Sequence, residues 1–100
     1  GFTPIAKYPP FEFDFAVIVD QQVSAGKLMT AIRSNAGKTL QNLDIFDVFE
    51  GESIGNDKKS IAFRLNFIDP NKTLNIKEVE PIINRIIKTL EKQFSAKLRG

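Results

Sequence analysis

The sequence predicts an α+β domain in which a four-stranded antiparallel sheet carries two helices on one face. Three observations favour this fold class. Apolar and polar residues alternate in four short segments, as they do in strands that are buried on one side. Two longer segments have apolar residues at helical spacing and capping residues at their ends. The chain of 100 residues has the size of one domain with one core.

The first strand follows a proline-rich lead-in. Residues 1–10 contain three prolines, which favour an extended segment, so we expect the folded domain to span residues 11–100. Within residues 11–20 the odd positions hold Phe and Val, whereas the even positions are mostly polar. These ten residues are therefore predicted to form a strand with one well-buried face.

A helix and a hairpin are predicted next. Ser24 can cap a helix over residues 25–36, and Gly37 can end it in the left-handed conformation. Alternation returns in residues 43–50 and 58–67. The segment between them contains two glycines and an Asn-Asp pair, which are typical of a hairpin loop.

The second helix and the last strand complete the order. Asn75 and Glu78 have the spacing of a capping box, and an apolar stripe follows them. Pro81 would remove a backbone hydrogen bond from this helix, so its regular part is expected to begin near residue 80. Residues 94–99 alternate again and are predicted to form a short last strand.

The order strand, helix, strand, strand, helix, strand is the ferredoxin-like arrangement. In this arrangement the first and third strands are central, the second borders the third, and the fourth borders the first. The helix-covered face is expected to hold Phe15, Val17, Val19, Phe46, Val48, Ile61, Phe63 and Leu65. The open face is expected to carry Asp14, Ala16, Ile18, Asp47, Phe49, Ser60, Ala62, Arg64, Lys97 and Arg99.

Composition limits the function classes. The net charge is only +2, so affinity for nucleic acid would depend on where the cations lie. Without Cys or His the chain has no disulfide, no thiolate site and no imidazole base or ligand. The scattered carboxylates form no pair of fixed geometry, which disfavours an enzyme. No segment approaches the roughly 20 apolar residues of a membrane span, and the N-terminus lacks signal-peptide order, so the cytoplasm is the expected compartment.

The position of Phe49 decides between two interpretations. Ile45 and Phe46 are adjacent apolar residues, so the phase of this strand is open, and a bulge could turn Phe49 into the core. If Phe49 is exposed, Ser60 and Ala62 beside it are small and leave a flat aromatic platform.

Such a platform suits single-stranded RNA. Bases of RNA stack on sheet aromatics and form hydrogen bonds with nearby polar groups, here the carboxylate of Asp47 and the hydroxyl of Ser60. Lys58, at the rim of the sheet, is either a solubilising residue or a phosphate contact.

Three blocks of the sequence resemble a known family. They are KYPPFEFDFAVIVD, IFDVFEGESIGNDKKSIAFRLNF and KTLNIKEV. In order and spacing they are similar to the ferredoxin-fold anticodon-binding domain at the C-terminus of the bacterial phenylalanyl-tRNA synthetase beta subunit. The most specific part is the Phe-Asp-Val-aromatic-x-Gly run followed by Lys-Lys-Ser. The resemblance runs from about Lys7 to Arg99.

The resemblance implies binding of the anticodon stem-loop of the phenylalanine tRNA on the open sheet face. Asp47 and Ser60 match the family's base hydrogen-bonding residues, and Phe49 matches its stacking residue, which is commonly tyrosine. The expected RNA-binding set is Asp47, Phe49, Ser60, Ala62, Lys58 and Arg64. Glu12 and Phe13 stand where relatives often have arginines, which argues against a phosphate contact from the first strand.

The resemblance also implies partners and cofactors. The chain would be an excised domain that works with the remainder of the beta subunit and with the alpha subunit in a heterotetramer, away from membranes. The parent ligase uses ATP and magnesium, whereas this domain is expected to hold no cofactor, no metal and no catalytic site.

A hypothesis from a different class stays open. A ferredoxin-like subunit-interaction or small-molecule regulatory domain would use the same open face, with Phe49 as an interface anchor. Chemical-shift mapping with an anticodon stem-loop distinguishes the two, because RNA binding would perturb residues 47–62.

Overall fold

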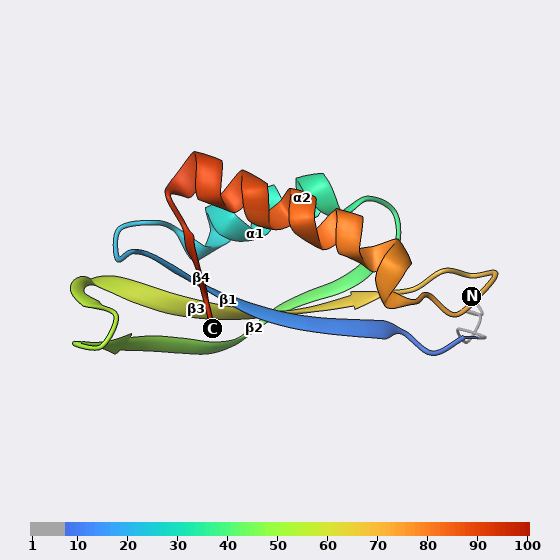
Figure 1. Cartoon of the computed structure of the whole chain (residues 1–100), viewed down its shortest axis with the longest axis horizontal. Coiled ribbons are helices and arrows are strands. Elements are labelled where there is room, and N and C mark those ends of the chain that lie inside the picture. The colour runs from blue at the N-terminus through green and yellow to red at the C-terminus, as the bar shows by residue number, and fades with distance from the viewer. Residues whose placement is uncertain (1–7) are drawn as a thin grey trace, which may run out of the picture.

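A computed structural model describes residues 8–100 and confirms the predicted order of elements (Figure 1). The elements are β1 (Phe11–Asp20), α1 (Ala25–Ala36), β2 (Leu40–Gly51), β3 (Gly55–Phe67), α2 (Ile76–Phe94) and β4 (Lys97–Arg99). The strands form one antiparallel sheet in the order β2-β3-β1-β4, so β1 and β3 are central as expected. Most of the predicted lead-in, residues 1–7, lies outside the described residues.

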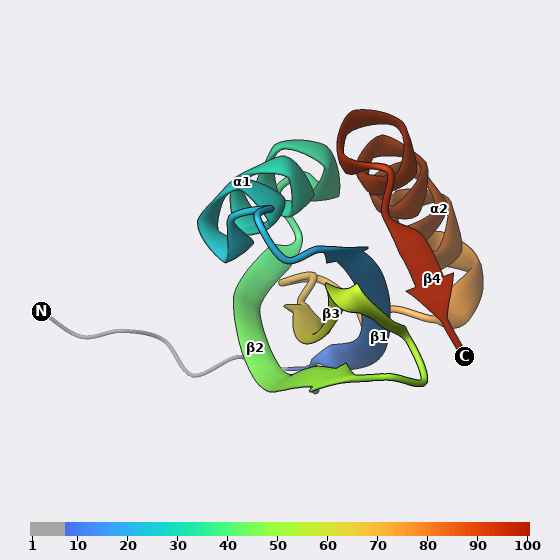
Figure 2. The same ribbon diagram turned by 90° about the vertical axis from the view of Figure 1, so that its left-hand side faces the viewer.

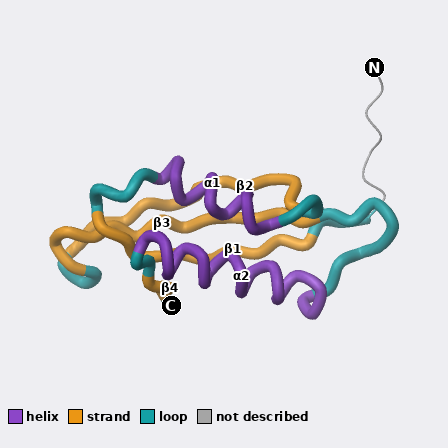
Figure 3. Tube along the Cα trace, turned by 90° about the horizontal axis from the view of Figure 1, so that it is seen from above, coloured by secondary structure: helices purple, strands orange, loops and turns teal. Residues whose placement is uncertain are grey.

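Both helices cover the same face of the sheet (Figure 1). Seen from above, α1 and α2 lie side by side and run roughly along the direction of the strands (Figure 3). The core lies between the two layers and is formed by apolar side chains from both helices and from β1, β2 and β3. Its most deeply buried members include Val17, Val19, Leu28, Ile32, Ile61, Phe63, Leu65, Phe67, Val79, Ile86 and Leu90. Within residues 8–100 no helix covers the opposite face of the sheet, and this open face carries the candidate site.

The predicted bounds and N-cap of α1 are confirmed, whereas Gly37 has a positive φ but not the left-handed helical conformation that was expected. The Ser24 hydroxyl caps the first turn by accepting a hydrogen bond from the backbone N–H of Lys27 at 3.3 Å. Gly37 follows the last helical residue with a φ of 78°, a conformation that L-residues with a side chain rarely adopt.

Helix α2 begins at Ile76, so the expectation of a start near residue 80 is wrong. The capping box of Asn75 and Glu78 fixes the first turn: the Asn75 side chain accepts from the Glu78 N–H at 3.1 Å, and Glu78 accepts from the Asn75 N–H. Pro81 lies within the helix. Pro81 and Lys77 are both exposed, so the Lys77 carbonyl that lacks a helical donor can bond to water.

The last helix also ends later than expected. Phe94 was predicted to open the last strand, but it is the final residue of α2 and packs against the core one turn after Leu90. Ser95 then adopts a left-handed conformation with a φ of 54°, and the Ala96 N–H donates to the Leu90 carbonyl at 3.3 Å. Strand β4 is therefore only three residues long.

The hairpin between β2 and β3 is tighter than predicted. Gly51 pairs with Gly55, so both strands extend into the segment that was expected to be loop. The turn is closed by hydrogen bonds from the Ile54 N–H to the Gly51 carbonyl and from the Gly55 N–H to the Glu52 carbonyl, both at 3.2 Å. Gly55 supplies the positive φ, 110°, that this turn requires.

Candidate nucleic-acid interface

A bulge in β2 sets which side chains reach the open face. The pairing with β3 shifts by one residue between Ile45 and Asp47, which leaves Phe46 as the extra residue. Phe46 is 48% exposed, and the Arg64 guanidinium lies 4.5 Å from the centre of its ring. The prediction of Phe46 on the helix-covered face is therefore wrong, because the bulge turns this side chain outward.

The apolar contribution of β2 to the core comes from earlier residues than predicted. Leu43 is buried, and Ile45 packs against the core. Val48 lies opposite Ile61, on the predicted side of the sheet, but it is 56% exposed and so is not covered by the helices.

Beyond the bulge, Phe49 lies on the open face. It is directly opposite Ser60, and Asp47 is opposite Ala62, as predicted. Opposed residues of an antiparallel pair project to the same side of the sheet. Phe49 is 36% exposed, which settles the question that the sequence left open: the strand does contain a bulge, but Phe46 absorbs the extra residue and Phe49 does not turn inward.

Two rows of side chains cross the open face from β4 to β2. The pairing register aligns Arg99, Ala16, Ala62 and Asp47 in one row. It aligns Lys97, Ile18, Ser60 and Phe49 in the next. The two alanines at the centre of the first row make this part of the face shallow. Ala62 is itself only 8% exposed, so it lies at the base of this shallow area and does not project toward a bound molecule.

The Phe49 ring extends across Gly51, two residues further along the same strand. A Cβ atom at Gly51 would lie 2.9 Å from the Cζ of Phe49, closer than real Cβ atoms approach a carbon. Glycine at this position therefore gives the ring the space that its orientation needs. The sequence predicts only a turn role for Gly51, because its contact with the Phe49 ring depends on the tertiary structure.

Arg99 reaches across the sheet to the same platform. Its guanidinium carbon lies 4.8 Å from the centre of the Phe49 ring, and its Nη1 donates a hydrogen bond to the Ser60 hydroxyl at 3.2 Å. In Figure 2 the later half of β2 bends beneath β3 and β1, toward the side of the sheet where β4 lies. Ser60 is only 2% exposed.

This role of Arg99 was not foreseen from the sequence. The pattern placed Arg99 on the open face, but its contacts depend on the curvature of the sheet and on the small side chain of Ala16, which is its partner on β1. An arginine opposite an alanine on an edge strand is the signal that could have indicated a side chain crossing the face.

Arg64 is held by carboxylates of β1. Its Nε and Nη2 donate to the two carboxylate oxygens of Asp14 at 3.0 and 2.9 Å. The Glu12 Oε1 lies 3.7 Å from the same Nε. The hydrogen bonds from Arg64 hold the pKa of Asp14 below its usual value, and those to Asp14 raise the pKa of Arg64. This member of the predicted RNA-binding set is therefore already paired within the domain.

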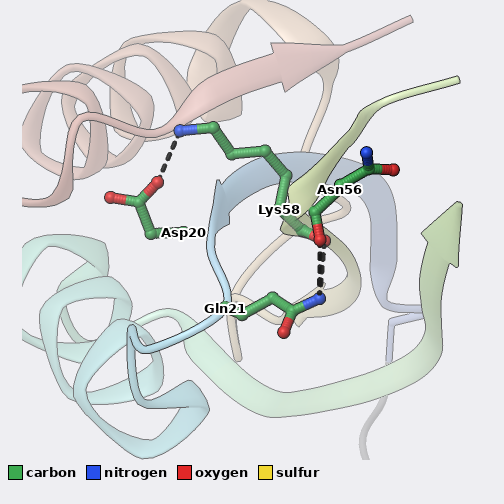
Figure 4. Close-up of polar contacts among 4 residues, drawn as sticks. All are labelled: Asp20, Gln21, Asn56 and Lys58. Atoms are coloured by element: carbon green, nitrogen blue, oxygen red, sulfur yellow. Dashed lines mark hydrogen bonds and ion pairs between the residues drawn. The ribbon is translucent and has the colours of Figure 1, made fainter. Parts of the chain in front are cut away.

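Lys58 is paired as well. Its ammonium group forms an ion pair with Asp20 at the end of β1, and this hydrogen bond raises the pKa of Lys58 (Figure 4). Gln21 lies beside this pair, where its side-chain amide donates to the backbone carbonyl of Asn56 at 3.4 Å (Figure 4). The contacts tie the end of β1 to the start of β3.

Over residues 8–100, no three or more acidic side chains are grouped so that they could hold a metal ion. None of the helices in that range has the length and apolar character needed to cross a membrane.

Comparison with known sequences gives a consistent result. Residues 6–99 match the family model described as "Ferredoxin-fold anticodon binding domain". The phenylalanine--tRNA ligase beta subunit of Bacillus licheniformis is 42% identical over 99 residues, which cover 99% of this chain and 12% of that protein. The same subunit of Bacillus subtilis is 39% identical with the same coverage, and that of Coxiella burnetii is 41% identical over 100 residues. The chain thus spans 12 to 13% of the length of these relatives.

Proposed function

Because the chain belongs to the family of ferredoxin-fold anticodon binding domains, we propose that it binds the anticodon stem-loop of the phenylalanine tRNA on the open face of its sheet. The name of the relatives, phenylalanine--tRNA ligase beta subunit, supports the choice of tRNA. The chain acts as one domain of such a subunit in the cytoplasm, together with the alpha subunit. The ATP- and magnesium-dependent chemistry belongs to other parts of that enzyme.

The observation that carries this proposal is the exposed aromatic residue on the shallow sheet face opposite the two helices. Phe49 is 36% exposed, its ring lies over Gly51, and Asp47 is on the same face in the neighbouring row. A base stacked on this ring would gain about 1–3 kcal/mol. Asp47 can accept hydrogen bonds from the amino or imino groups of that base, which distinguishes bases that donate from those that only accept.

The charges of the open face indicate that base contacts supply more of the affinity than phosphate contacts. Strand pairing places five carboxylates on this face, from Glu12, Asp14, Asp20, Asp44 and Asp47, against four cations, from Lys58, Arg64, Lys97 and Arg99. Two of the cations are held in ion pairs. We therefore expect weak binding by the chain alone, with the rest of the subunit contributing further contacts.

The test is a substitution of the stacking residue. Phe49→Ala should weaken binding of the phenylalanine anticodon stem-loop by roughly 5- to 150-fold, the equivalent of one lost base stack. Fluorescence anisotropy with a labelled stem-loop measures this change. Val48→Ala is the matched control, because Val48 is the adjacent residue of the same strand and projects from the opposite side of the sheet; it should leave affinity within about twofold.

A stem-loop with an unrelated anticodon completes the design. Equal affinity for both stem-loops would mean that the face does not read the anticodon. Absence of any binding by the wild-type chain, together with concentration-dependent self-association or capture of the ligase alpha subunit, would favour the alternative of a subunit-interaction domain.

A further inference from the structure

We propose that Arg99 is a placeholder on the stacking platform: its guanidinium occupies the place of the base in the free domain and moves to a phosphate of the RNA when a base binds. This inference rests on the function proposed above. It assigns to a residue of the last strand two successive contacts, one within the protein and one with the nucleic acid.

The first contact is present in the structure. The guanidinium carbon lies 4.8 Å from the centre of the Phe49 ring, and Nη1 bonds to the Ser60 hydroxyl. A flat cation over a ring face resembles a stacked base in shape and in the surface that it covers. While no RNA is bound, the guanidinium packs over the Phe49 ring and donates a hydrogen bond to the buried Ser60 hydroxyl.

The same contact obstructs the predicted base contacts. A base stacks in van der Waals contact with the ring, at about 3.5 Å, so it cannot lie on the ring face that the guanidinium covers. Ser60 is only 2% exposed and already accepts a hydrogen bond from Arg99. Ser60 can therefore reach a base only after Arg99 has moved.

Movement of Arg99 is favoured by its place in the fold. It lies on the three-residue edge strand β4, which pairs only with β1, and it is exposed. Among residues 8–100 no carboxylate forms an ion pair with it, in contrast to Arg64 and Lys58. A displaced guanidinium on this face is thus available to a phosphate, which it can bind through two parallel hydrogen bonds.

The first experiment needs no RNA. A double-mutant cycle of Phe49→Leu and Arg99→Ala, measured by chemical denaturation, should show coupling of about two- to fivefold in the unfolding equilibrium constant, the size of an exposed cation–π contact. The leucine keeps the apolar packing over Gly51. Additive effects of the two substitutions would mean that Arg99 does not occupy the platform and would overturn the placeholder role.

The second experiment measures the salt dependence of binding to the phenylalanine anticodon stem-loop. Arg99→Ala should lower the slope of log affinity against log salt concentration by about 0.7, the contribution of one phosphate contact to a single strand. Arg99→Lys should retain the slope while weakening the coupling to Phe49, because an ammonium group keeps the charge but lacks the planar surface that stacks on a ring. Lys92→Ala, which removes the same charge from α2, is the control and should leave the slope nearly unchanged.

The two experiments separate this inference from the proposed function. A wild-type chain that does not bind the stem-loop overturns the proposed function and, with it, the transfer to phosphate. A wild-type chain that binds with a slope that Arg99→Ala does not change overturns the transfer alone. A lower slope together with coupling in the free domain supports both contacts.

Discussion

Gly51 and Phe49 act as a pair, because the Phe49 ring lies where a side chain at position 51 would be. We predict that Gly51→Ala displaces the ring, since the new Cβ would lie 2.9 Å from Cζ. The ring tip is free to shift, so the free energy of unfolding should change by only about 1 kcal/mol or less. Stem-loop affinity should nevertheless fall severalfold, which anisotropy would detect. Unchanged affinity would show that stacking does not depend on this ring position.

Asp14 should give the domain a measurable pH dependence. Its pKa in the folded state lies below the ordinary 3.8 because Arg64 donates two hydrogen bonds to it. The stabilisation is therefore fully present above pH 3.8 and is lost as the pH falls through the lower folded-state value. Solvent screening keeps the effect small, because the Asp14 side chain is 37% exposed.

The measurement is acid unfolding of the wild type and of two variants. Asp14→Asn should flatten the decline in stability below pH 3.8, and Arg64→Gln should flatten it equally because it removes the same pair. A wild-type slope that survives in both variants would assign the acid sensitivity to other carboxylates.

At the scale of the element, α2 depends on its capping box. Asn75→Ala removes the side-chain acceptor for the Glu78 N–H and should lower the free energy of unfolding by about 1 kcal/mol. Asn75→Ser keeps an acceptor at the N-cap and should recover most of that loss. Urea denaturation distinguishes the two variants, and equal losses would mean that α2 is held by its packing alone.

The bulge in β2 is the element that decides the candidate site. With one extra residue at Phe46, the strand places Leu43 and Ile45 toward the core before the bulge and keeps Asp47 and Phe49 on the open face after it. Alternation along a strand is broken by a bulge, and a single sequence does not indicate which of two adjacent apolar residues is the extra one.

At the scale of the whole molecule, the two faces of the sheet have different tolerance to truncation. Phe63 is fully buried on β3, and Phe63→Ala should cost about 3–5 kcal/mol through lost burial and the cavity left behind. Phe46→Ala removes the same ring from an exposed position and should cost about 1 kcal/mol or less. Since a small domain is stable by only about 5–15 kcal/mol, the first substitution should lower the melting temperature markedly. Similar losses for the two variants would contradict this separation of faces.

The sequence by itself determined the order of elements, the neighbours of each strand, the N-caps of both helices and the location of Phe49 relative to Ser60. These features follow from local periodicity, capping chemistry and the few ways in which this order of elements can pack. Tertiary structure alone decided the exposure of Phe46, the extent of α2 through Phe94, and the contacts of Arg99 with Phe49 and Ser60. The physical reason is that each of these depends on residues far apart in the chain: on a pairing register that a bulge shifts, on packing against the core, and on a sheet curved enough to bring its edges within reach of one side chain.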